Sequence, residues 1–303
     1  MHGLSNWIAG RRAQNCLVGL GVSTAAFGVV IAIIASFVAI IPHSNAAESG
    51  QAIVDFAGYW GRPEPARGAA NFYPLENGPV PVSFGAESGE PRQGMPYIGD
   101  DTNPILLPHA AEAVRAQRDT YRRGEAVWSA WALCWPTGVP LAFSMVNAVQ
   151  FLQKEDEVTI IYQRGQTVRH IYLNEGHPPD PALTWFGHSV GHYEGSDTLV
   201  IDTIAQDPRA LIDRFGTPKS EAMRVTERYT LSADRQRLDI GFTVEDPKTF
   251  TTAWSARVAY ARMPPRGGEG PQEAIFAQII CPENNRDAAG GGYPIPVATT
   301  RDF

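Results

Sequence analysis

The second half of the chain repeats one pattern, in which apolar residues occupy every other position of short runs that end at turn residues. A period of two is typical of a strand with one buried face. We expect strands at 158–162, 168–173, 198–203, 224–231, 237–244, 251–261 and 274–281. Because no helical pattern separates these runs, we expect antiparallel connections, which favour a lipocalin-like barrel; a β-sandwich is the alternative.

The rest of the chain gives weaker signals. One short helix is expected at 110–123, where apolar and arginine residues fall on opposite faces. Residues 48–105 contain many prolines and glycines, so we expect an irregular lead-in that wraps a core. Residues 106–303 then form a single β-barrel domain with a C-terminal extension.

The first 47 residues are predicted to be an export signal or a transmembrane anchor. No charged residue occurs from 13 to 47, and the apolar stretch at 17–41 follows Arg11 and Arg12. About 20 apolar residues span a bilayer, which favours an uncleaved membrane anchor. Small residues at 44–47 leave a cleaved signal peptide open. Either interpretation places the domain outside the cytoplasm, in the periplasm, tethered to the inner membrane by one helix if uncleaved.

The cysteine count agrees with an exported domain. Cys16 lies at the edge of the apolar stretch, which leaves Cys134 and Cys281 in the exported part. An even pair in an oxidising compartment predicts a disulfide between them. A reactive thiol or a metal ligand is the less favoured alternative.

The charge balance excludes one class of partner. The chain has 25 basic and 32 acidic residues, a formal charge of −7, and no basic run. Phosphate binding needs clustered cations, so we expect no nucleic acid partner. No phosphate-binding loop or dinucleotide fingerprint follows a strand, so we expect no cofactor.

Histidines supply the strongest chemical signal. His170, His177, His188 and His192 fall within 23 residues. Imidazole exchanges protons near neutral pH, and a nearby carboxylate fixes its tautomer. The cluster therefore points to general acid–base catalysis, with His177 or His188 as the proton-transferring residue.

The remaining catalytic roles fall to charged residues near this cluster or on a later strand. We expect Arg169 to stabilise developing negative charge and either Glu194 or Glu227 to orient the imidazole. The alternative is a purely structural role, in which the same side chains hydrogen-bond a loop and close the end of the barrel.

Two further kinds of site are weaker alternatives. His188, His192 and Glu194 resemble a metal-ligand set, but residues four apart on a strand are about 13 Å distant. Ser189 has glycines at the spacing of a serine-hydrolase elbow, but no helical pattern follows it. We expect neither a metal centre nor a serine hydrolase.

Aromatic and polar residues near the histidines are candidates for ligand binding. They would line a barrel mouth that holds a small apolar molecule. The residues are Trp135, Tyr172, Trp185, Ser189, Tyr193 and Arg228.

Several segments resemble a large, poorly characterised bacterial family of exported proteins. The clearest is 185–203, which is similar to the family pattern W-x-G-x-S-x-G-x-W-E-G-D-T-L-V-V-D-T. Further similar strings lie at 55–60, 134–140, 169–172, 176–178, 220–221, 225–228, 245–247 and 281–284. The resemblance implies an extracytoplasmic, predominantly β domain with both cysteines at matching positions.

The resemblance also has departures. Tyr193 stands where the family has a second Trp, and Ser196 is an extra residue before Asp197. An insertion here is expected to form a bulge and re-aim Glu194 or Asp197. Among the candidates, Arg169, His177, His188, Ser189, Glu194, Asp197, Glu227 and Arg228 match the family pattern.

Together these observations predict an exported β-barrel that performs cofactor-free acid–base chemistry, of the lyase, dehydratase or isomerase type, on a small, largely apolar ligand. The alternative is a non-catalytic small-molecule binding protein or an accessory subunit of a membrane complex. An enzyme predicts His177 or His188 beside an acidic residue and open to a cavity. A scaffold predicts histidines that are satisfied by backbone groups with no cavity beside them.

Overall fold

The structure is a computed structural model that describes residues 54–62, 72–80, 99–124, 134–145 and 147–263. The chain divides into two units, Met1–Glu48 and Ser49–Phe303, and every described residue belongs to the second. The expected anchor at 1–47 and the expected strand at 274–281 lie outside the described residues. Within the described part, no helix has the length and hydrophobicity needed to cross a membrane.

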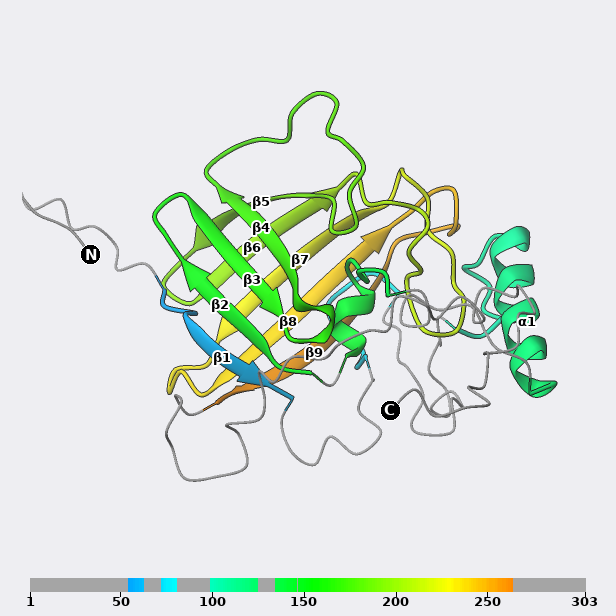
Figure 1. The fold of residues 1–303 in the computed structure, drawn as a ribbon, viewed down its shortest axis with the longest axis horizontal. Coiled ribbons are helices and arrows are strands. Elements are labelled where there is room, and N and C mark those ends of the chain that lie inside the picture. Colours follow the sequence, from blue (N-terminus) through cyan, green and yellow to red (C-terminus); the bar gives the residue numbers. More distant parts are fainter. Residues whose placement is uncertain (1–53, 63–71, 81–98, 125–133, 146, 264–303) are drawn as a thin grey trace, which may run out of the picture. The chain divides into compact units, whose positions relative to one another are not determined.

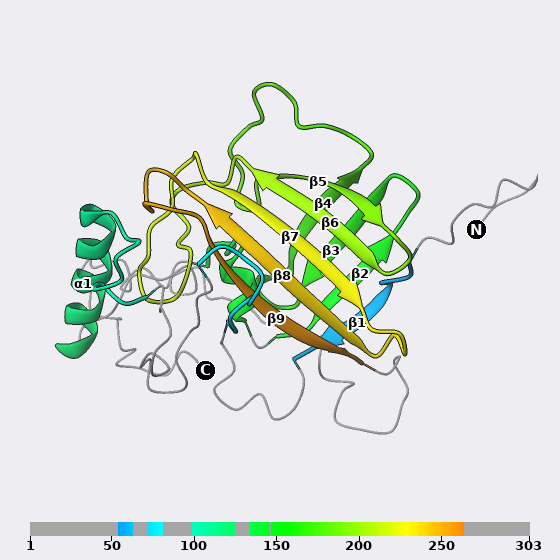
Figure 2. The same ribbon diagram turned by 180° about the vertical axis from the view of Figure 1, so that it is seen from behind.

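The described strands form a closed barrel in which sequence order is also spatial order (Figures 1 and 2). The strands are β1 (Gly58–Gly61), β2 (Val149–Gln153), β3 (Glu157–Tyr162), β4 (Thr167–Leu173), β5 (His188–Glu194), β6 (Thr198–Ile204), β7 (Arg224–Leu231), β8 (Arg237–Glu245) and β9 (Trp254–Arg262). The expectation of a mainly β barrel with one helix is confirmed, and the sandwich alternative is not.

One pair of neighbouring strands departs from the expected antiparallel meander. β4 and β5 are parallel, and their ladder is short, running only from Ile171 opposite Ser189 to Leu173 opposite Gly191. A parallel pair needs a crossover, and residues 174–187 supply it without a helix. This crossover projects from the barrel beside β4 and β5 (Figure 1).

The pattern of alternating burial in the strands follows from the barrel. On β7, Val225, Glu227, Tyr229 and Leu231 are buried and point inward, whereas the residues between them face outward. On β8 the same alternation buries Leu238, Ile240, Phe242 and Val244. These residues belong to one continuous hydrophobic core, because the inward faces of the strands meet inside the barrel.

The strand that closes the barrel comes from the Pro-rich lead-in. β1 pairs with β2 on one side and with β9 on the other. It contributes Trp60, which is fully buried and whose ring nitrogen donates to the carbonyl of Phe56. The segment at 48–105 therefore includes a strand of the barrel as well as irregular chain.

The single helix of the described residues is α1 (Pro108–Arg122), close to the expected 110–123. It buries Ala110 and Val114 in the main core. Asp101 holds it from the preceding loop through ion pairs with Arg115 and Arg118. Two 3₁₀ turns complete the described elements, η1 (Leu141–Ser144) and η2 (Arg164–Gln166), and η2 forms the turn between β3 and β4.

Candidate functional site

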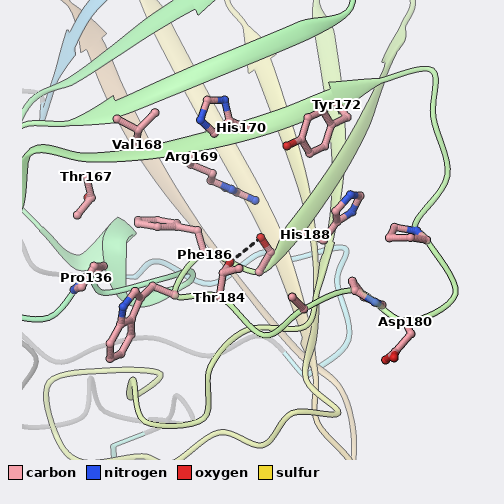
Figure 3. Close-up of a pocket in the computed structure, with 15 residues that line it drawn as sticks. Pro136, Thr167, Val168, Arg169, His170, Tyr172, Asp180, Thr184, Phe186 and His188 are labelled. Atoms are coloured by element: carbon pink, nitrogen blue, oxygen red, sulfur yellow. Dashed lines mark hydrogen bonds between the residues drawn. The ribbon is translucent and has the colours of Figure 1, made fainter.

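A cavity of about 520 Å³ lies between β4 and the end of the crossover. Its lining combines consecutive β4 residues with prolines and aromatic residues of the loops. Figure 3 shows Pro136 and Thr167 at one end of the cavity, and Tyr172 and His188 at the other. The lining residues are Pro136, Thr167, Val168, Arg169, His170, Tyr172, Pro178, Asp180, Pro181, Ala182, Thr184, Trp185, Phe186, Gly187 and His188.

Two of the predicted histidines meet beside this cavity. Nδ1 of His188, the first residue of β5, lies 2.9 Å from Nδ1 of His177 on the crossover. The His188 ring also stacks on Tyr172 of β4, with ring centroids 5.2 Å apart. His188 therefore has a fixed position at the wall of the cavity, held from both sides.

A carboxylate completes the arrangement. Nε2 of His177 lies 3.1 Å from an oxygen of Asp202 on β6. Arg224 of β7 in turn donates two hydrogen bonds to Asp202, at 2.7 and 2.8 Å. These four side chains form one chain of contacts, from Arg224 through Asp202 and His177 to His188.

The contacts decide which nitrogen of each neutral imidazole carries its proton. Because a carboxylate only accepts hydrogen bonds, Nε2 of His177 must donate to Asp202. Nδ1 of a neutral His177 is then an acceptor, so Nδ1 of His188 carries the shared proton. Nε2 of His188 is left with a lone pair, and within the described residues no protein group contacts it at hydrogen-bond distance.

The surroundings of His188 favour its neutral form. Burial is the larger cause that lowers the pKa of this imidazole, and the charge of a protonated His177 lowers it further; Glu175 acts in the opposite direction. A neutral imidazole with a lone pair is the form that accepts a proton.

Arg169 and Glu227 form a separate, fully buried polar cluster inside the barrel. The terminal nitrogens of Arg169 donate to both Glu227 oxygens, at 2.9 and 2.7 Å. Nε of Arg169 donates to Ser189 at 3.1 Å, and a terminal nitrogen donates to Thr203 at 2.6 Å. The hydroxyl of Tyr229 donates to Glu227 at 2.9 Å. Each polar side chain of this cluster therefore has a hydrogen-bond partner within the cluster.

The pKa values reflect this internal pairing. Burial opposes the charge on Arg169, but the charge and hydrogen bonds of Glu227 outweigh it, so the pKa of the guanidinium is raised. Burial and the Glu227 charge raise the pKa of Tyr229. Arg169 lines the cavity, yet its guanidinium is directed to Glu227, Ser189 and Thr203 rather than to a ligand's developing charge.

The two predicted orienting carboxylates lie away from the histidine pair. Glu227 is inside the barrel with Arg169. Glu194, at the opposite end of β5 from His188, is exposed and pairs with Arg228 at 2.6 Å and with His192 at 3.4 Å. In this structure it is Asp202, rather than Glu194 or Glu227, that contacts a histidine of the pair.

The metal-ligand alternative does not assemble. His188 and His192 are four residues apart on β5, which separates them by about 13 Å. Across the described segments, no group of three or more His, Cys, Asp or Glu side chains is placed to hold a metal ion.

The serine and the extra residue of this region also have definite places. Ser189 points into the barrel on β5, where it contacts Arg169 and Thr203. The chain continues from it as a strand, so no nucleophile elbow forms. Ser196 lies in the turn between β5 and β6, so the insertion falls in a hairpin loop rather than within a strand.

The remaining ligand-binding candidates are divided between two places. Trp185 lines the cavity and packs against Trp135, with centroids 5.1 Å apart, and the Arg209 guanidinium lies over the Trp185 ring. Tyr193 instead bonds Gln153 at the other end of the β5–β6 hairpin, near Arg228. Cys134 is half-buried near Trp135, and Cys281 lies outside the described residues, so their pairing stays a prediction.

Asp202 is the residue of this candidate site that the sequence reasoning did not select. It follows an apolar run on β6 and faces outward, in register with Val190 of β5. The available signal was that Asp202 is the one charged residue of an otherwise uncharged strand, because an unpaired charge on a barrel strand is expected to face away from the core.

Comparison with known proteins adds no relative. Searches against protein families and against curated proteins give no match to this chain.

Proposed function

We propose that this chain is an exported protein whose cavity carries out cofactor-free acid–base chemistry on a small, largely apolar ligand. One observation carries the proposal: His188 lines the cavity and is held by His177, which contacts the carboxylate of Asp202. An enzyme was expected to have a histidine beside an acidic residue and open to a cavity, whereas a scaffold was expected to have neither feature.

The proposed reaction begins at Nε2 of His188. This nitrogen takes a proton from a carbon or oxygen of the ligand, and the proton on Nδ1 passes to His177. The resulting imidazolium stays beside Asp202, whose negative charge stabilises it, while Arg224 holds the carboxylate in place. Return of the proton to another ligand atom gives isomerisation, and its return to a leaving hydroxyl gives dehydration.

The lining supports an apolar ligand without a strong net charge. Prolines and aromatic rings supply much of the wall, and Arg169 is neutralised by Glu227. Besides His188 and Tyr172, the other titratable lining residues are Asp180 and His170, and His170 contacts Glu157. The proposed location outside the cytoplasm rests on the sequence alone. The apolar stretch at 17–41 supports export and, if it is not cleaved, attachment to a membrane.

A non-catalytic binding protein is the second candidate. It is favoured by the contact between His177 and His188, which also ties the crossover to the barrel wall and would shape a binding site without any reaction. The two candidates differ in what happens to a bound molecule.

Deuterium incorporation distinguishes them. The purified chain is incubated in D₂O with small enolisable ketones such as cyclohexanone and phenylacetone, which are also tested for binding by thermal shift. Proton abstraction predicts incorporation by the wild type, loss with His188→Gln and retention with the control His192→Gln, which changes a histidine outside the cavity. A ketone that binds the wild type and both variants equally and gains no deuterium would favour the binding protein.

A further inference from the structure

Four consecutive residues of β4, 167–170, line the cavity. Side chains on a strand alternate between its two faces, so one face contributes only every second residue. A run of consecutive residues means that the edge of the strand borders the cavity. The polar groups of that edge are backbone N–H and C=O groups.

The hydrogen bonds on both sides of β4 show which residues present these groups. The amide of Leu173 donates to Asp156 on the β3 side, whereas the amide of Asn174 donates to Gly191 on the β5 side. The directions alternate along a strand, so the backbone groups of residues 171, 169 and 167 face β3. Those of Val168 and His170 face β5 and the cavity.

The strand that would pair with Val168 is missing because the chain turns away. Continued backward, the β4–β5 register would place Phe186 opposite Val168. Instead, Gly187 has a left-handed φ of +69° and its amide donates to Thr184, which forms a turn at 184–187. Only glycine fits there, because an added Cβ would lie 2.1 Å from the carbonyl oxygen of Ile204.

Val168 therefore presents a donor and an acceptor to the cavity. Within the described residues no backbone group bonds them across the cavity, and Val168 is 46% exposed, so water can reach its edge. A purely apolar ligand would remove that water and leave both groups without partners, at a cost of about 1–3 kcal/mol each. The ligand that fits best supplies a complementary acceptor and donor.

We propose that the cavity takes a short, uncharged, peptide-like molecule that extends alongside β4 and pairs with Val168. This inference rests on the proposed function and specifies its substrate class. In antiparallel pairing, the N–H and C=O of one ligand residue bond the C=O and N–H of Val168. Its apolar side chain lies among the prolines and aromatic residues, and its end approaches His188, about 7 Å further along the strand.

The first test compares two variants and two probes. The probes are N-acetyl-phenylalanine N′-methylamide and the same molecule methylated on the phenylalanine nitrogen, which removes one donor. Val168→Pro deletes the amide that faces the cavity but no amide of the β3–β4 ladder, and Val168→Ala keeps the amide while shortening the side chain. We expect Val168→Pro to weaken binding of the first probe about tenfold, and Val168→Ala less than threefold.

The methylated probe is expected to bind the wild type about tenfold more weakly than the first probe. Equal binding of the first probe to Val168→Pro and Val168→Ala would overturn the proposal, as would failure of that probe to bind the wild type. Circular dichroism checks that both variants retain the barrel.

A second measurement needs no variant. In the wild-type protein, amide hydrogen exchange should be fast at Val168 and slow at Arg169 and Ile171, and the first probe should slow exchange at Val168 at least tenfold. Slow exchange at Val168 without the probe would overturn the inference. Catalysis is tested separately. Peptide binding without any His188-dependent deuterium incorporation would contradict the proposed function alone. Deuterium incorporation into ketones without peptide binding would contradict this inference alone.

Discussion

The Nδ1 atoms of His177 and His188 lie 2.9 Å apart, so one proton is shared between the two rings. The carboxylate of Asp202 at the far nitrogen of His177 decides which ring donates it. The carboxylate thus orients one imidazole, and the second imidazole lines the cavity.

The first prediction concerns this carboxylate. Asp202→Asn removes the charge that stabilises a protonated His177, so proton transfer away from His188 becomes unfavourable. We expect deuterium incorporation to fall at least tenfold, with ligand affinity changed less than threefold. Asp239→Asn is the matched control, because Asp239 is also paired with an arginine, Arg237, on the barrel surface. An equal loss in both variants would count against a specific role for Asp202.

The second prediction concerns the titration of His188. Burial and the charge of His177 lower its pKa, so NMR titration should give a midpoint below the usual 6.5 of histidine. His177→Gln removes one cause and leaves burial, so the midpoint should rise. Because the unfolded chain binds this proton more readily, His188 should reduce stability as the pH falls below about 6.5. An unchanged midpoint in His177→Gln would show that the rings are not coupled.

The barrel was accessible from sequence because alternating burial is a local property. Arg224–Leu231 has the predicted bounds, and the other described strands that were predicted differ from them by one to three residues. The parallel β4–β5 pair was not predicted, because β5 was not among the expected strands and because alternation reports the buried face of a strand and not the direction of its neighbour. β1 and β2 were also missed; β1 is short and lies among prolines and glycines.

The site was predicted in part for a related reason. The histidine cluster is local in sequence, and two of its members meet at the cavity. Asp202 is 25 residues from His177, and only the pairing of β5 with β6 brings it close. Arg169 and Glu227 were expected to act on a ligand and on a histidine. They pair with each other inside the barrel instead, because β4 and β7 both direct a charged side chain inward.

The third prediction concerns Lys219, a buried residue outside the cavity lining. Its amine donates to the side-chain oxygen of Gln206 at 3.1 Å. Burial lowers its pKa to about 7, although the charges of Asp207 and Asp246 oppose this. Between pH 7 and 10 the unfolded chain therefore holds a proton that the folded chain has lost, so Lys219 makes stability rise with pH.

Lys219→Met should flatten that rise, measured by urea unfolding at several pH values between 6 and 10. The side-chain oxygen of Gln206 retains the amide of Val139 as a donor, at 3.0 Å, so the substitution leaves this oxygen satisfied. Lys248→Met is the control, because Lys248 is exposed and pairs with Glu221. If both variants kept the slope of the wild type, Lys219 would be charged in the folded protein across this range.

The fourth prediction concerns the buried pair of Arg169 and Glu227. Glu227→Gln keeps the shape and an acceptor for Tyr229 but leaves the Arg169 charge buried without its counter-charge. We expect a loss of about 3–5 kcal/mol in the free energy of unfolding, measured by urea denaturation. Arg169→Met combined with Glu227→Gln removes both charges and should recover much of that loss, because desolvating an unpaired charge is the main cost. The contrary outcome is a double variant whose loss of unfolding free energy equals the sum of the losses for Glu227→Gln and Arg169→Met alone. The two side chains would then act independently, and the cluster would stabilise the barrel through its hydroxyl contacts instead.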